Sequence, residues 1–264
     1  MANWNDLPNK IKKLVVKKMT FETRAQLKMC SKTDKCLVES CPMVFDMLRI
    51  GANSVPSGMA SFLTLHENSE KCFEIYFMFD SNRSEVNIMR KQLLPVSPIF
   101  CASVEASVTL AKQIFTSILT NGKLSFETVR VLYNYPQFLI NSDFTIHTKH
   151  VQIEGGTKYI SAWLNVIAPG VESVYLQPKA MYTSNTIVRL RTVSAIMNAS
   201  TITIECDTDI SDNQLVRFKC TRFAHLGQSK ITGKGINQLI KKMIANDYPT
   251  DTCFTICTIG NPQT

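Results

Sequence analysis

The second half of the chain alternates between short apolar segments and stretches with helical periodicity, and this alternation limits the folds open to it. Segments typical of strands begin near residues 128, 144, 172, 201, 222 and 253. Helical periodicity fills intervals between them, at residues 157–168, 186–198, 211–219 and 235–245. Repeating helix–strand units bury their apolar faces on their neighbours. We therefore expect an irregular, solenoid-like α/β body, with a mixed sheet in a two-layer α/β domain as the alternative.

The region before these units also combines strands with a helix. Residues 62–65 and 72–79 are typical of two strands, and the polar residues 66–71 between them predict the turn of a hairpin. Apolar residues then recur at helical spacing over residues 104–119. The body of the chain, residues 58–264, is therefore expected to be an α/β domain.

Charge separates a small N-terminal part from this body. The chain has 264 residues and a formal net charge of +8. Residues 1–36 hold nine basic and three acidic side chains, so they carry +6 of that charge. Turn-forming residues at 50–58 mark the expected break between the two parts. The sequence therefore predicts a basic module at residues 1–49, whose charge favours an anionic partner.

The basic module is expected to form three short helices. Asp6, Thr20 and Ser31 are the expected caps of these helices, and Pro42 follows the third one. The first helix carries a single apolar arc, which is made of Leu7, Ile11, Leu14, Val15 and Met19. Lysines outside this arc predict a basic face, which is made of Lys10, Lys12, Lys13 and Lys17. Because a unit of this size has little core of its own, we expect it to pack on a partner.

This module resembles an F-box. The family pattern has Leu-Pro, aliphatic residues along the first helix, and later a Leu and a Val-Cys-like pair. Those positions are filled here by Leu7, Pro8, Ile11, Val15, Val16, Met19, Leu27, Cys30 and Ser31. Lys10 stands where the family usually has Glu, and Asp34 stands near the position of a frequent Trp. The opening Trp-x-Asp-Leu-Pro and the Arg24-x-x-Leu27 pattern are similar to the nematode-expanded F-box families.

The resemblance implies a partner and a binding surface. F-box helices dock on the Skp-type adaptor of a cullin ubiquitin ligase. The adaptor-binding residues that the resemblance implies are Leu7, Pro8, Ile11, Leu14, Val15, Val16, Met19, Leu27, Cys30 and Ser31. By this reading, the apolar face of the first helix is shared between the core of the module and the adaptor. Residues 162–170, 210–216 and 229–237 resemble the F-box-associated domain of the same families, which is regarded as a substrate-recognition module.

The expected fold is therefore a short three-helix F-box followed by an irregular leucine-rich-repeat-like α/β body. The expected function is that of the substrate-recognition subunit of a Skp-cullin-F-box ubiquitin ligase, which binds an unknown target protein through its C-terminal domain. Two alternatives remain: a basic helical nucleic-acid-binding protein, and a scaffold that works outside the ligase. Arg24 is the one arginine among the nine basic residues of 1–36, which speaks against nucleic acid as the partner.

The sequence contains no recognisable constellation of an enzyme. P-loop, dinucleotide-binding, His-Glu-x-x-His and Gly-x-Ser-x-Gly motifs are all absent. Cys253 and Cys257 share a strand face, but no second pair or nearby His completes a zinc site. His147 and His150 are expected to face opposite ways on their strand. We therefore expect no catalytic residue, no metal and no cofactor.

The sequence also indicates where such a protein would work. No basic segment followed by an apolar run opens the chain, and no stretch approaches the roughly 18 apolar residues of a membrane span. Nine cysteines, an odd number scattered along the chain, fit free thiols in a reducing compartment. We therefore expect an intracellular protein, cytoplasmic or nuclear, that has no membrane partner.

Overall fold

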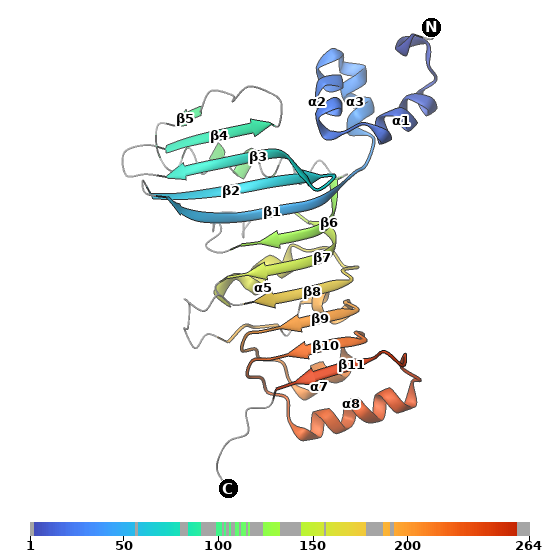
Figure 1. Cartoon of the computed structure of the whole chain (residues 1–264), viewed down its shortest axis with the longest axis vertical. Coiled ribbons are helices and arrows are strands. Elements are labelled where there is room, and N and C mark those ends of the chain that lie inside the picture. Colours follow the sequence, from blue (N-terminus) through green and yellow to red (C-terminus); the bar gives the residue numbers. More distant parts are fainter. Residues whose placement is uncertain are drawn as a thin grey trace. The chain divides into compact units, whose positions relative to one another are not determined.

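A computed structural model of the chain describes residues 3–55, 58–79, 84–90, 99–101, 103, 106, 109–110, 112–114, 116, 124–132, 144–155, 157–177, 187–190 and 193–257. The chain divides into two compact units. Unit 1 comprises Met1–Glu127 and Pro136–Phe144, and unit 2 comprises Thr128–Tyr135 and Thr145–Thr264. The protein has a mixed α/β fold, with helices at its N-terminus and a large body of β-sheet (Figure 1).

Unit 1 opens with short helices in close succession (Figure 1). They are the 3₁₀-helix η1 (Trp4–Asp6) and the α-helices α1 (Asn9–Lys18), α2 (Phe21–Cys30) and α3 (Lys32–Glu39). The expected caps of α2 and α3 are confirmed. The Thr20 hydroxyl accepts a hydrogen bond from the backbone N–H of Thr23, and the Ser31 hydroxyl accepts one from Asp34. Each of these two caps begins a new helix within three residues of the end of the preceding one.

The start of α1 differs from the expectation. Asp6 does not cap α1, because it is the last residue of η1, and the side chain of Asn3 caps that short helix. Leu7 and Pro8 are extended, and α1 begins directly after Pro8. The residue at the N-cap position of α1 is therefore Pro8, and no side chain in the described structure caps this helix with a hydrogen bond.

Antiparallel strands follow the helices in unit 1. They are β1 (Met43–Val55), β2 (Gly58–Glu67), β3 (Glu70–Phe79), β4 (Ser84–Arg90) and β5 (Ile99–Cys101), each hydrogen-bonded to the next. The expected hairpin is confirmed: the turn between β2 and β3 lies at Asn68 and Ser69, which both have positive φ. Residues 43–49, expected within the helical module, instead begin β1. The helix expected over residues 104–119 lies largely outside the described residues.

Aromatic contacts join α2 to the sheet of unit 1. The ring of Phe21 lies 5.5 Å from that of Phe45 on β1 and 5.6 Å from that of Phe73 on β3, measured between centroids. The backbone N–H of Phe21 donates to the carboxylate of Glu67 at 2.9 Å. Because Phe45 and Phe73 are buried, the first turn of α2 is fixed to the core of the sheet.

Unit 2 alternates strands and helices along the chain (Figure 1). Its elements are the end of β6 (Leu124–Val131), then β7 (His147–Glu154), α5 (Thr157–Asn165), β8 (Ser173–Gln177), α6 (Ser194–Asn198), β9 (Thr201–Ile204), α7 (Asp212–Arg217), β10 (Arg222–His225), α8 (Gly233–Ala245) and β11 (Cys253–Ile256). Strands β7 to β11 are parallel, and each lies beside the next in chain order. The strands predicted from residue 144 onward are therefore confirmed.

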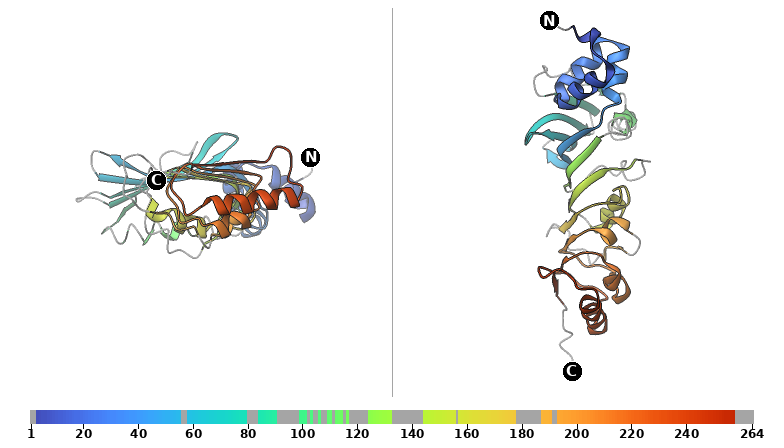
Figure 2. Two further views of the ribbon diagram at one scale, coloured as in Figure 1. Left: turned by 90° about the horizontal axis from the view of Figure 1, so that it is seen from below. Right: turned by 90° about the vertical axis from the view of Figure 1, so that its right-hand side faces the viewer.

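The two faces of this parallel sheet differ in burial. Val174 and Leu176 on β8, like Ile202 and Ile204 on β9, are at most 1% exposed. Helices α5, α7 and α8 lie on one side of the strands (Figure 2). The opposite face is half-exposed and carries polar side chains. We call it the polar sheet face, and it is made of Gln152, Ser173, Tyr175, Thr201 and Thr203.

The helix expected at residues 186–198 is shorter in the structure. Of the described residues in this range, only Ser194–Asn198 form α6, and residues 186, 191 and 192 lie outside the described part. Val188 makes a parallel bridge with Thr208, and the backbone N–H of Leu190 donates to the buried carboxylate of Asp209 at 2.8 Å. These backbone groups pair with a neighbouring segment, so they do not enter a helix. None of the helices in the described part of the chain is long and apolar enough to span a membrane.

Candidate functional site

Three residues of the apolar arc predicted for the first helix, Ile11, Leu14 and Val15, point to solvent. Ile11 is 42% exposed, Leu14 53% and Val15 38%, although all three are aliphatic. At about 100° per residue they lie within an arc of roughly 100°, and we call these three residues the outward face of α1. Pro8, just before the helix, is also exposed, and Leu7 is half-buried. An aliphatic face of this kind is costly in water and is typical of a binding surface.

Val16 holds α1 to the rest of the module. It is fully buried, and with Leu37, Val38 and Cys41 it forms a small core. Partly buried hydrophobic residues pack against this core, namely Trp4, Met19 and Leu27. Val16 lies about 140° from Ile11 around the helix, so the contact to the core and the outward face are on different sides of α1. Of the predicted adaptor-binding residues, Val16 is therefore the one that has no exposed surface.

The end of α2 adds a residue that the sequence reasoning missed. Met29 is 83% exposed, and the neighbouring Cys30 and Ser31 are exposed as well. Leu27 packs on the core of the module, and Met29 lies about 200° further around α2. Once Leu27 is assigned to the core, the helical period alone would have placed Met29 on the outside.

A buried arginine fixes the geometry of the three helices. Arg24 is only 5% exposed, and its guanidinium donates to the carbonyl oxygens of Met19, Cys41 and Pro42 at 3.3, 3.3 and 3.1 Å. Burial lowers the pKa of Arg24 from its usual value. These bonds connect the end of α1 to the chain that follows α3, so Arg24 has a structural role.

Trp4 and Asp34 connect the short helix η1 to the first turn of α3. The indole N–H of Trp4 donates to the Asp34 carboxylate at 2.9 Å, and the Ser31 hydroxyl donates to it at 2.7 Å. These bonds hold the pKa of Asp34 below its usual range. The ammonium of Lys12 lies 5.6 Å from the centroid of the Trp4 ring. Trp4 therefore has a structural role, because it packs on the core of the module and donates to Asp34.

Positive charge surrounds the outward face of α1. Lys10, Lys13, Lys17 and Lys18 are exposed. In the described part of the chain none of them forms a salt bridge, whereas Lys28 pairs with Glu39 at 3.7 Å. An aliphatic surface with a rim of free lysines fits a partner that is apolar at the centre of its contact and acidic at its edge.

The cysteines and histidines considered for chemistry do not form a site. All nine cysteines are free, and Cys253 and Cys257 are exposed. Burial raises the pKa of the Cys72 and Cys206 thiols to about 12, so neither is a thiolate at neutral pH. His150 Nδ1 lies 2.8 Å from the hydroxyl of Ser173 on the next strand. Within the described ranges, no group of three or more His, Cys, Asp or Glu residues could hold a metal ion.

Residues 4–46 match the F-box domain. The chain therefore carries an F-box domain. It spans η1, the three helices and the start of β1, and it includes every predicted adaptor-binding residue as well as Met29. The outward face of α1 and the core around Val16 thus belong to one recognised domain.

The chain is also similar to one curated protein over most of its length. It is 26% identical over 270 residues to a Caenorhabditis elegans protein described as an uncharacterized F-box protein. The alignment covers 91% of this chain and 66% of that protein, so the chain spans about two thirds of the length of this relative. No solved structure matches the chain.

Proposed function

We propose that this protein is the substrate-recognition subunit of a Skp-cullin-F-box ubiquitin ligase. In this proposal the F-box domain binds a Skp-type adaptor, the adaptor links the chain to a cullin, and the C-terminal α/β body binds a target protein. One observation carries it: within an F-box domain, α1 exposes Ile11, Leu14 and Val15 while Val16, on another side of the helix, is buried in the core.

The exposed side chains supply enough apolar surface for a stable contact. Complete burial of one Leu, Ile or Val is worth roughly 1.5–3 kcal/mol. Each residue of the outward face of α1 keeps between 38% and 53% of its surface exposed, so about half of that value is still available from each. The free lysines around this face would mainly accelerate the encounter with an acidic adaptor.

The C-terminal body is proposed to be a leucine-rich-repeat-like F-box-associated domain. Strands β7 to β11 are parallel and follow chain order, and α5, α7 and α8 lie on one side of them. The alternative, a mixed sheet in a two-layer α/β domain, would include antiparallel neighbours among these strands, whereas a solenoid of repeats keeps them parallel and in chain order. This arrangement supports the solenoid and leaves the polar sheet face for a target.

The proposed mechanism is proximity, and it requires no catalytic residue, metal or cofactor in this chain. A bound target would be held near the ubiquitin carried by the partner enzymes of the ligase, which perform the chemistry. This role places the protein in the cytoplasm, the nucleus or both. The free thiols of the described structure are compatible with that location.

The nucleic-acid alternative fits the N-terminal surface less well. Phosphate contacts need a face of cations, and here three exposed aliphatic side chains interrupt the basic residues of α1. A scaffold that works outside the ligase would use the same apolar surface on another partner. Identifying the partner that binds α1, a Skp-type adaptor, a nucleic acid or another protein, distinguishes these alternatives from the proposed function.

The test is a binding titration with a purified Skp-type adaptor. Leu14→Asp and Val15→Asp place a charge on the outward face of α1 without touching the core, so we expect folded proteins that no longer form a one-to-one complex. Leu226→Asp is the matched control, because Leu226 is 48% exposed and lies in unit 2. We expect this control to bind like the wild type. A folded wild-type chain that binds no such adaptor contradicts the proposal.

A further inference from the structure

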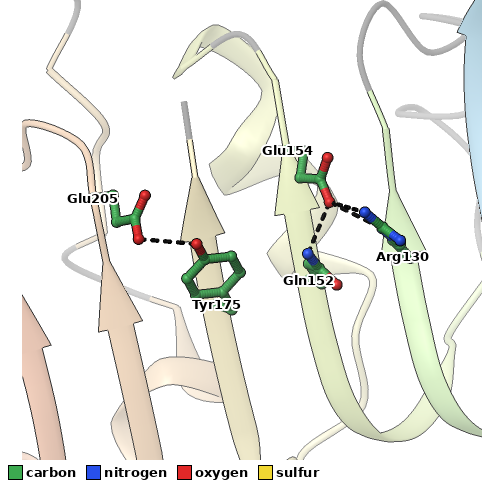
Figure 3. Close-up of polar contacts among 5 residues, drawn as sticks. All are labelled: Arg130, Gln152, Glu154, Tyr175 and Glu205. Atoms are coloured by element: carbon green, nitrogen blue, oxygen red, sulfur yellow. Dashed lines mark hydrogen bonds and ion pairs between the residues drawn. The ribbon is translucent and has the colours of Figure 1, made fainter. Parts of the chain in front are cut away.

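Two carboxylates stand on the side of the polar sheet face, at the C-terminal ends of their strands (Figure 3). Glu154 is the last residue of β7, and Glu205 directly follows β9. Each makes a hydrogen bond to a side chain from another strand, as the dashed lines in Figure 3 show. The two carboxylates differ in what compensates their charge.

The charge of Glu154 is compensated within the protein. Arg130 donates to one carboxylate oxygen through Nε at 2.9 Å and Nη2 at 2.6 Å, and Gln152 donates to the same oxygen at 2.7 Å (Figure 3). The Glu154 side chain is 8% exposed. A carboxylate this deeply buried needs such a cation, and Arg130 provides it. Glu154 therefore has no charge left to offer a partner.

Among the described residues, Glu205 has no such compensation. Its carboxylate accepts a hydrogen bond from the Tyr175 hydroxyl at 2.9 Å, but no Lys, Arg or His among the described residues forms an ion pair with it. Burial and the nearby Glu205 raise the pKa of Tyr175, so its hydroxyl stays a neutral donor. The bond orients the Glu205 carboxylate and leaves its negative charge in place.

On β8 and β9, the polar sheet face beside Glu205 carries polar, uncharged side chains. Tyr175 on β8 is paired with Thr203 on β9, and two residues earlier on the same strands Ser173 is paired with Thr201. Hydroxyl groups such as these bond readily to peptide N–H and C=O groups. Farther along the sheet, Arg222 on β10 is already paired with Asp251 at 3.1 Å. Glu205 is thus an oriented, half-buried anion within a row of hydroxyl groups.

We propose that the polar sheet face binds an extended segment of the target protein that carries a lysine or arginine, and that Glu205, oriented by Tyr175, pairs with that cation. The inference rests on the proposed function, because it assigns the target to unit 2. Charge complementarity selects the occupant: a cationic side chain compensates Glu205, whereas the phosphates of a nucleic acid would be repelled by it. Glu205 is the binding residue, and Tyr175 is a positioning residue.

The experiment selects peptides from a random phage-displayed library on the full chain bound to its adaptor. We expect the selected peptides to share Lys or Arg at one position. Binding of a selected peptide, measured by fluorescence anisotropy, should weaken at least about tenfold in Glu205→Gln, which is the loss of a charge-assisted bond worth about 1.4 kcal/mol or more. Glu205→Lys should instead select peptides with Asp or Glu at that position.

Two controls separate binding from folding. Asp247→Asn removes a negative charge from the exposed turn that follows α8 in the same unit, and it should leave peptide affinity unchanged. Tyr175→Phe should weaken binding by about two- to fivefold in the wild type and have no effect in the Glu205→Gln background, because it acts only through that carboxylate. Thermal unfolding checks that each variant is folded.

The outcomes separate this inference from the proposed function. Adaptor binding is measured in the same sample. A chain that binds the adaptor but selects no peptides, or acidic ones, or peptides that bind Glu205→Gln equally well, overturns the inference and leaves the proposed function standing. An oligonucleotide that competes with the selected peptides also overturns it. A chain that does not bind the adaptor contradicts the proposed function itself.

Discussion

Val16 and Leu14 lie two residues apart on α1, and the structure predicts opposite consequences for the same truncation. Val16 is fully buried, so Val16→Ala removes two methyl groups from a packed core. At about 0.8 kcal/mol per buried carbon plus a cavity contribution, the cost is about 2–3 kcal/mol. Leu14 is 53% exposed. Leu14→Ala should change the stability of the module by less than about 0.5 kcal/mol, because alanine also favours the helix.

Hydrogen exchange followed by mass spectrometry is the suitable assay, because a chain of two compact units need not unfold in one step. In Val16→Ala, amides of α1, α2 and α3 should exchange roughly 30- to 150-fold faster than in the wild type, which corresponds to 2–3 kcal/mol of lost opening free energy. In Leu14→Ala their exchange should be nearly unchanged. Equal acceleration in both variants would refute the division of α1 into a core side and an outward side.

Three further outcomes follow from the structure. The hydrogen bonds to Asp34 lower the pKa of its carboxyl in the folded module. They stabilise the module fully above the unfolded pKa near 3.8, and this stabilisation is lost as pH falls through the lower folded pKa. Asp34→Asn should remove this pH dependence from the exchange of α3 amides. Burial lowers the pKa of His225 below 6.5, so the stability of unit 2 should fall as pH drops from 6.5 toward the folded value, and His225→Gln should flatten the pH profile of exchange in β10. Phe223→Ala should lower the free energy of unfolding by about 3–5 kcal/mol because Phe223 is 2% exposed. Phe254→Ala on β11 should lower it by roughly half as much because Phe254 is only half-buried. Equal losses in denaturant unfolding would contradict the position of β11 at the end of the sheet.

Local sequence signals predicted the regular elements of this chain well. The caps Thr20 and Ser31 lie where short polar side chains precede helical periodicity, and the structure confirms both. The alternation of strands and helices from residue 144 onward is confirmed for the same reason, since it depends on hydrophobic period within each segment. Asp6 failed as a cap because η1 forms before α1, and no local pattern marks that short helix.

Long-range contacts decided the features that the sequence did not predict. Val188 and Leu190 are extended because they pair with Thr208 and Asp209, which lie farther along the chain, whereas their own periodicity suggested a helix. The bond between Tyr175 and Glu205 joins residues 30 positions apart and depends on the register of two strands. This register cannot be predicted from the strand propensity of the two segments or from the spacing of their residues.

The candidate binding surface was predicted as a set of residues but not as a geometry. The apolar arc of α1 was clear from the spacing of its aliphatic residues. Hydrophobic pattern cannot distinguish an aliphatic side chain that enters the core from one that awaits a partner, because both are apolar at helical spacing. The structure makes this distinction between Val16 and its neighbours Leu14 and Val15. It also adds Met29, whose exposure depends on which side of α2 meets the core.

The most direct measurement is a hydrogen-exchange footprint of the full chain with and without a bound Skp-type adaptor. We predict slower exchange in α1 and at the end of α2 around Met29, with exchange in β7 to β11 unchanged. Protection confined to unit 2, or a one-to-one complex that leaves the amides of α1 unprotected, would contradict this prediction, because the adaptor would then bind somewhere other than the outward face of α1.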